Sequence, residues 1–223
     1  MLSPFKIVLI SFLNVPKNLS VVFAWLILLL NSGLMENTIR LRPKGLYIKQ
    51  YLTTLNMELV IDACSIILLA KATVLEEFTK WKKTMITQGV YNEVLEGKDK
   101  QLLDALLLER LVEEKKISVE DNLRKKMIQK LIDDFGVGIG EAESIALALE
   151  SKDKTMLTDN KQGRKAAKVH GLKLLGSVEV VTSLFKKGKI SKEKTISALR
   201  TLKDKGWFQD YLIEGALEEV QNG

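Results

Sequence analysis

The sequence after residue 57 alternates short apolar runs with longer segments whose apolar residues recur at helical spacing. Runs such as Leu59 to Ile61 suit short buried strands, and the segments between them suit the helices that connect parallel strands. This alternation is the pattern of βαβ units. It therefore predicts an α/β fold built on a parallel sheet.

The expected elements follow one another without an internal repeat or a low-complexity segment. Strands are expected at residues 59–61, 84–87, 117–119, 155–158 and 173–175. Helices are expected at residues 65–81, 89–95, 102–112, 123–135, 141–150 and 161–170, and then at 177–185, 191–203 and 211–220. The pattern thus predicts a domain over residues 57–176 and a helical carboxyl-terminal extension, residues 177–223, that packs on it.

Residues 1–56 are a different kind of sequence, without the alternating pattern. They contain an apolar run, LSVVFAWLILLL, at residues 19–30. A helix of this length spans only about 18 Å against about 30 Å of bilayer hydrocarbon, so the run resembles a signal-peptide core more than a membrane span. We expect translation to begin at Met57 and the protein to be cytoplasmic. The alternative is membrane association through residues 19–30.

The positive net charge is concentrated outside the expected domain. The chain carries a net charge of +6, but six of its 34 Lys and Arg residues and one of its 28 acidic residues fall in residues 1–56. The remaining 28 basic and 27 acidic residues leave the rest of the chain nearly neutral. Any affinity for nucleic acid must therefore come from local patches rather than from the overall charge.

Carboxylates are the side chains most available for chemistry. Cys64 is the single cysteine and His170 the single histidine. This excludes an internal disulfide and a multi-cysteine zinc site, and it disfavours histidine-based catalysis. Acid and base chemistry is therefore expected from Asp and Glu.

Two aspartates directly follow expected strands. Asp62 comes after the run that ends at Ile61, and Asp159 comes after the strand that ends at Thr158. The carboxyl ends of parallel strands meet at one edge of the sheet, where ligands bind at the switch point between strands. Each aspartate alone could instead cap the helix that follows its strand. Two of them at one edge favour a functional site.

Three glutamates complete the candidate set. Glu93 lies one turn into a helix that follows a strand, where a glutamate is more often simply exposed. Glu141 and Glu143 open a later helix and lie about 200° apart around it, so at most one of them should face a shared site. Glu141 borders the apolar stripe of that helix, whereas Glu143 points away from it. The geometry favours Glu141 and keeps Glu143 as a candidate.

A basic helix follows Asp159. Arg164 and Lys168 share one face of this helix at a spacing of four residues. Together with Ser65 and Asn160 they are candidate contacts to nucleic acid. The alternative is a basic surface helix that is simply solvated.

These acids and their flanking motifs resemble the PIN-domain family of nucleases. The similar features are a first strand ending in Asp62, a Val-x-x-Glu-Val-Leu helix around Glu93, a Gly-Glu-Ala-Glu-x-Ile-Ala-Leu-Ala helix from Gly140, and a Leu-Thr-Asp strand end at Asp159. The run from Arg164 to Gly176 is similar to a prokaryotic, VapC-like subgroup with a helical carboxyl-terminal tail. The resemblance covers about residues 57–205.

The resemblance implies a three-layer α/β/α fold and an endoribonuclease that hydrolyses RNA phosphodiester bonds with Mg²⁺ or Mn²⁺. Carboxylates crowded at a strand edge repel one another unless a hard cation neutralises them, and such cations prefer oxygen ligands. The implied partners are an RNA substrate, a small antitoxin protein if the chain is a toxin, and a second copy of the chain. No nucleotide cofactor is implied. The implied metal-binding and catalytic residues are Asp62, Glu93, Glu141 or Glu143, and Asp159.

One position departs from the family pattern. Members commonly have Asp-x-Ser/Thr at the end of the first strand, whereas here Cys64 stands two residues after Asp62 and Ser65 comes one later. This leaves open an inactive PIN-fold protein that binds RNA or serves as a scaffold. A receiver or switch domain that accepts phosphate on Asp62 is a third interpretation, but no acidic pair precedes the first strand.

Overall fold

The computed structural model describes residues 58–96, 103–121 and 123–222 of the chain. The strands are β1 (Glu58–Ile61), β2 (Lys83–Thr87), β3 (Ile117–Glu120), β4 (Thr155–Leu157) and β5 (Lys173–Leu175). The helices are α4 (Ala63–Lys71), α5 (Leu75–Trp81), α6 (Gln88–Leu95), α7 (Leu103–Glu113), α8 (Lys125–Phe135), α9 (Ile139–Glu150), α10 (Lys161–Val169), α11 (Ser177–Lys186), α12 (Lys192–Lys205) and α13 (Asp210–Asn222).

The predictions for the amino-terminal segment fall outside these ranges. They include the apolar run at residues 19–30, the start of translation at Met57 and the alternative of membrane association. Among the helices that the structure does describe, none combines the length and the apolar character needed to cross a bilayer.

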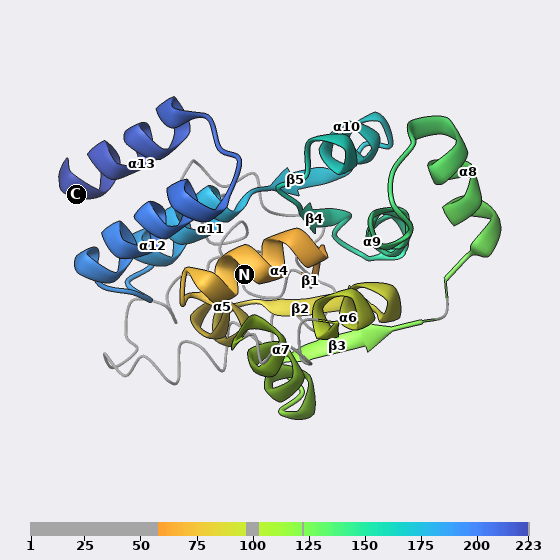
Figure 1. Ribbon diagram of the computed structural model, residues 1–223, viewed down its shortest axis with the longest axis horizontal. Helices are drawn as coiled ribbons and strands as arrows, with labels where there is room; N and C mark the ends of the chain where they lie inside the picture. The colour runs from red at the N-terminus through yellow and green to blue at the C-terminus, as the bar shows by residue number, and fades with distance from the viewer. Residues whose placement is uncertain (1–57, 97–102, 122, 223) are drawn as a thin grey trace, which may run out of the picture. The chain divides into compact units, whose positions relative to one another are not determined.

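The five strands form one parallel sheet in the order β3-β2-β1-β4-β5 (Figure 1). The chain runs outward from β1 through β2 to β3 and then crosses back to place β4 on the other side of β1. Ile61 pairs with Leu157 where β1 and β4 lie side by side. The order of strands therefore reverses between β1 and β4, which is the switch point at which α/β sheets bind ligands.

Alternate residues of β1 face opposite layers of helices, as the period of a strand requires. Leu59 and Ile61 belong to a core shared with α4, α5 and α11, whereas Val60 belongs to a second core shared with α9 and α10. Both faces of the central strand are thus covered, and all three residues are almost completely buried. The structure confirms the expected three-layer α/β/α fold.

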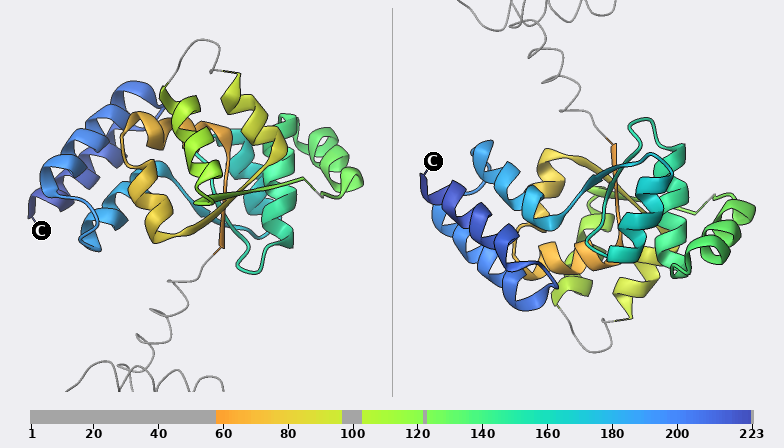
Figure 2. Two further views of the ribbon diagram at one scale, coloured as in Figure 1. Left: turned by 90° about the horizontal axis from the view of Figure 1, so that it is seen from below. Right: turned by 90° about the horizontal axis from the view of Figure 1, so that it is seen from above.

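The carboxyl-terminal helices α11, α12 and α13 lie side by side at one end of the fold, and α8 lies at the opposite end (Figures 1 and 2). Leu199, Leu202, Ile213 and Val220 from α12 and α13 are buried in the same core as residues of α4. These helices therefore contribute to the main hydrophobic core as well as covering it.

One expected element is wrong. The helix predicted over residues 65–81 is two helices, α4 and α5, because Thr73 adopts a left-handed conformation with φ 57°. The amide of Val74 then donates to the carbonyl of Leu69 at 3.0 Å and closes the end of α4. Apolar residues on both sides of the break are buried, so the periodicity that predicted one helix continues through it.

The carboxyl-terminal helices lead to a stability prediction. Leu199→Ala should lower the free energy of unfolding by about 2–5 kcal/mol, because it removes a fully buried side chain and leaves a cavity. Trp207→Ala, at a side chain that is 104 % exposed just after α12, should change it by less than about 0.5 kcal/mol. Urea denaturation of the full-length variants measures both. Equal, small effects would show that α12 does not belong to the cooperative core.

Candidate active site

Asp62 follows β1 at the switch point and is 2 % exposed. Its Oδ1 accepts a hydrogen bond from the Ser65 backbone amide at 2.8 Å and so caps α4. Burial raises the pKa of Asp62 to about 6, although the nearby Thr158 hydroxyl and the Ser65 donors favour the charged form. Asp62 therefore does both things that the sequence suggested: it caps the following helix, and it lies at the carboxyl edge of the sheet.

Two buried oxygens at this place lack a hydrogen-bond partner among the residues that the structure describes: Asp62 Oδ2 and Thr158 Oγ1. The Thr158 hydroxyl lies close enough to lower the pKa of Asp62, but the two groups do not meet the geometry of a good hydrogen bond. A buried carboxylate oxygen without a donor is unfavourable by itself. Asp62 Oδ2 is therefore available to accept a proton or to bind a cation.

Asp159 follows β4 and is held by three donors from two helices. The Ser65 hydroxyl donates to Asp159 Oδ2 at 3.0 Å, the Ser177 amide donates to Oδ1 at 2.9 Å, and the Ser177 hydroxyl also donates to Oδ2. The charge of Asp159 in turn contributes to the raised pKa of Asp62. Ser177 was not predicted as a site residue; its place two residues after the last strand was the available signal.

Glu93 and Glu141 form a second pair on α6 and α9. Burial raises the pKa of Glu93, and the charge that adds most to this effect is that of Glu141. Glu141 is half-buried, and its Oε2 accepts the Gly138 amide at 3.0 Å across the first turn of α9. The structure thus brings Glu93 close to Glu141, as the helical-wheel argument favoured.

Glu143 has a different neighbour. Its Oε2 accepts the backbone amide of Gly89, at the start of α6, at 3.2 Å. Glu143, which the helical wheel turned away from the apolar stripe of α9, thus contacts α6, a helix that packs against α9. Its carboxylate contacts the amino-terminal turn of α6.

The exposed thiol of Cys64 lies within the electrostatic reach of both pairs. Burial of part of the side chain raises the pKa of Cys64 to about 12, and the charges of Asp62, Asp159, Glu141 and Glu93 add to the shift in that order. The charges of four of the five candidate carboxylates therefore act on the Cys64 thiol. These four belong to two pairs, Asp62 with Asp159 and Glu93 with Glu141.

Three of the four predicted nucleic-acid contacts bond within the protein. Ser65 is buried and donates to Asp159, and Asn160 caps α10 by accepting the amides of Gln162 and Gly163. Arg164 Nη1 donates to the carbonyls of Thr158 at 2.8 Å and Leu175 at 3.1 Å, which ties the ends of β4 and β5 together. Lys168 is exposed on α10. Contact of these residues with nucleic acid stays a prediction.

The candidate ligand atoms are of the type that a hard cation prefers. The four acids offer only carboxylate oxygens, and Asp62 Oδ2 is buried without a donor, which fits the preference of Mg²⁺ and Mn²⁺. Within the described ranges, however, no three Asp, Glu, Cys or His side chains are placed to hold one ion together. The acids stand instead as two pairs, one at the ends of β1 and β4 and one on α6 and α9.

Comparison with models of known protein families gives a match over most of the described chain. A family model described as a PIN domain matches residues 58–222. The chain belongs to the PIN-domain family. PIN domains are generally nucleases that act on nucleic acid and usually use divalent metal ions. The match does not single out the VapC-like subgroup, which stays a prediction.

Searches of curated proteins and of solved structures return no match for this PIN domain. The family assignment therefore rests on the model match, and the placement of the acids is an independent observation.

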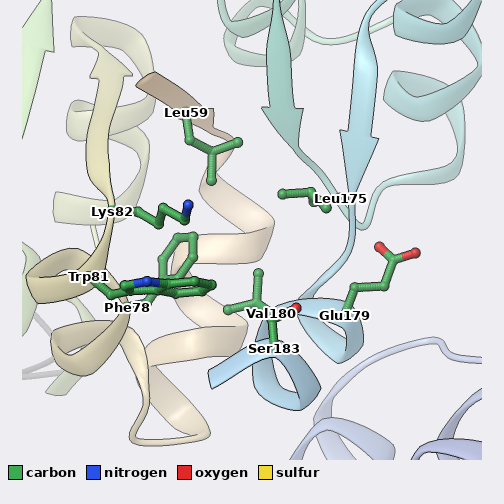
Figure 3. Close-up of a pocket in the computed structure, with 8 residues that line it drawn as sticks. All are labelled: Leu59, Phe78, Trp81, Lys82, Leu175, Glu179, Val180 and Ser183. Atoms are coloured by element: carbon green, nitrogen blue, oxygen red, sulfur yellow. The ribbon is translucent and has the colours of Figure 1, made fainter. Parts of the chain in front are cut away.

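A cavity of about 180 Å³ lies between α5 and α11 (Figure 3). Phe78, Trp81 and Val180 give it apolar walls, and Lys82 lies with its ammonium 4.4 Å from the centroid of the Trp81 ring. None of the five candidate acids lines this cavity. It offers a place for an apolar group, and the carboxylate among its lining residues, Glu179, accepts the Gly176 amide.

Asp62 makes stability depend on pH. The folded pKa of about 6 exceeds the ordinary value of 3.8, so the folded state holds the proton more tightly, and stability is lost as the pH rises through this window. Asp62→Asn keeps a capping side chain and removes the charge. In chelator, it should be more stable than wild type by about 3 kcal/mol near pH 7.5 and nearly equal near pH 4. Urea denaturation at both pH values tests this; a less stable variant near pH 7.5 would contradict it.

Cys64 should be unreactive although it is exposed. With a pKa of about 12, about one thiol in ten thousand is ionised near pH 8, so alkylation by iodoacetamide in chelator should be at least about a hundredfold slower than for free cysteine. Glu141→Gln should speed the reaction, because it removes one of the charges that raise the pKa. Glu150→Gln, at the other end of α9, is the matched control. Mass spectrometry reads the label unambiguously in a chain with one cysteine. Alkylation as fast as that of free cysteine would rule out the four-carboxylate surroundings.

Proposed function

We propose that this PIN domain is a metal-dependent endoribonuclease that hydrolyses RNA phosphodiester bonds. The observation that carries the proposal is the buried, unpartnered Oδ2 of Asp62 at the switch point of the sheet, with Asp159 beside it and the charges of Glu93 and Glu141 acting with these two aspartates on Cys64. A carboxylate is costly to keep in such a place. Cation binding would explain why a carboxylate occupies this buried position.

The proposed metal ligands are Asp62, Asp159, Glu93 and Glu141, and the proposed ion is Mg²⁺ or Mn²⁺. When bound, the metal would activate the attacking water and stabilise the charge that develops on the phosphate and the leaving oxygen. Asp62 and Asp159 are the better ordered pair, because backbone and hydroxyl donors fix their orientation. Glu93 and Glu141 extend from helices and supply the second side of the site. Ser65 and Ser177 orient Asp159.

The proposed RNA surface is the exposed side of α10, which begins just after Asp159. Lys161, Lys165 and Lys168 are exposed there, and lysines at such positions contact phosphate rather than bases. Arg164 holds two strand ends from the same helix. This arrangement supports RNA binding that depends on salt more than on sequence.

A toxin role with a small antitoxin, or a homodimer, remains a finer proposal. Trp207, Tyr211 and Leu212 are 104 %, 69 % and 45 % exposed around the start of α13. Large apolar side chains that are exposed in this way support contact with a protein partner. The cytoplasmic location and the absence of a nucleotide cofactor stay predictions.

Cleavage of RNA tests the main proposal. The purified full-length chain should cut a panel of RNAs in Mg²⁺ or Mn²⁺ and stop in chelator. Asp62→Asn and Glu141→Gln should each reduce the rate at least about a hundredfold, because each removes a ligand from the charge-stabilising centre. Gel analysis of labelled RNA measures the rates, and Glu150→Gln is the matched control on α9.

Two outcomes would reject the proposal. Undiminished cutting by Asp62→Asn would exclude a mechanism based on the carboxylates. Wild-type protein that binds RNA yet gives no metal-dependent product would favour the inactive RNA-binding alternative, for which Cys64 in place of the family's hydroxyl is the specific sequence feature.

A further inference from the structure

Two glycines and two glutamates interlock α6 with α9. An added Cβ on Gly89 of α6 would lie 2.1 Å from Glu143 Oε2 of α9, and one on Gly140 of α9 would lie 2.8 Å from Glu93 Oε2 of α6. Real Cβ atoms do not approach oxygen so closely. Each helix therefore has a glycine where the other helix places a carboxylate.

The spacing of these residues explains the reciprocal contact. Gly89 and Glu93 are four residues apart and share one face of α6, whereas Gly140 and Glu143 are three residues apart and share one face of α9. With those faces packed together, each glutamate reaches the first turn of the opposite helix.

The glycines provide space here, not backbone freedom. Among the described glycines, a positive φ is found at Gly136, Gly171 and Gly188, and not at Gly89 or Gly140. The atoms that an added Cβ would meet are the ends of flexible glutamate side chains. An alanine would therefore displace a carboxylate rather than the backbone.

The contact of Glu143 also completes the amino terminus of α6. The first amides of a helix lack partners within the helix. The Thr87 hydroxyl accepts the Val90 amide at 3.1 Å, and Glu143 accepts the Gly89 amide at 3.2 Å. A negative charge there is also favourable for the helix dipole. Glu143 thereby fixes the turn that directly precedes Glu93.

We propose that Glu143 is a positioning residue that holds α6 so that Glu93 stands over Gly140 at the metal edge, and that Glu141 alone is the metal ligand from the start of α9. This inference rests on the proposed metal-dependent function. It separates two glutamates that the sequence leaves as alternatives. Glu141 acts on Glu93 and Cys64 through its charge, whereas Glu143 acts through a hydrogen bond to backbone.

Binding of Mn²⁺ to the full-length chain without RNA distinguishes the two roles. A glutamine at position 143 still offers an oxygen to the Gly89 amide, so Glu143→Gln should bind Mn²⁺ within about twofold of wild type, whereas Glu143→Ala should bind about tenfold more weakly. Glu141→Gln, the same chemical change two residues earlier, should weaken binding at least about tenfold. Titration calorimetry, or the electron paramagnetic resonance signal of free Mn²⁺, measures the affinities.

Gly140→Ala provides a second test of the same interlock. It should weaken Mn²⁺ binding about tenfold with little change in melting temperature, because it displaces the carboxylate of Glu93 rather than the backbone. Gly215→Ala in α13, where an added Cβ meets nothing within 4 Å, is the control and should leave Mn²⁺ binding unchanged.

The outcomes separate the two proposals. If wild type binds Mn²⁺ and Glu143→Gln loses as much affinity as Glu141→Gln, Glu143 is a ligand and the positioning role is wrong. Unchanged Mn²⁺ affinity in both Glu143→Ala and Gly140→Ala would also overturn it. If wild type does not bind Mn²⁺, the proposed metal-dependent function fails and this inference fails with it.

Discussion

Asp62 places an ionisable carboxyl group where its side chain is 2 % exposed and where Oδ2 has no donor in the described part of the chain. Three elements meet at this residue. Its amide donates to Leu157 of β4 at 3.1 Å, its Oδ1 caps α4, and the hydroxyl of Thr158 lies near its side chain. The end of β1 is therefore fixed in space by bonds that also fix the carboxylate. The position is unfavourable for the charge but well defined in geometry.

The fold was predictable to the extent that burial alternates along the chain. Five short apolar runs identified the five strands, and the strand ends identified Asp62 and Asp159 as neighbours across the switch point. The break at Thr73 was not predictable, because it depends on one left-handed residue inside a continuous apolar pattern. Periodicity reports which face is buried and carries little information about where a helix stops.

The acidic residues of the candidate site could be selected from the sequence, but most of their contacts could not be predicted. Order and spacing along the chain selected the carboxylates, and the helical wheel favoured Glu141, whose charge acts on Glu93 in the structure. The wheel could not find the partner of Glu143, because it describes one helix and the Gly89 amide belongs to another. Ser177 was missed for the same reason, since it opens α11 and its hydroxyl meets Asp159, 18 residues earlier, only in the folded chain. Contacts between elements follow from packing, which no single-helix pattern contains.

The hydrogen bonds of Asp159 link the carboxyl-terminal helices to the acids. Ser177 opens α11, and α11 shares a core with α12, α13 and α4, the helix that Asp62 caps. Packing in that core therefore bears on the orientation of both aspartates. The same arrangement couples charge to stability, because the raised pKa of Asp62 means that its ionised form weakens the folded state at neutral pH. A cation bound to the folded state alone would offset this penalty and stabilise it in proportion to the logarithm of cation concentration. In this PIN domain, metal affinity and folding stability would then depend on the same buried oxygen.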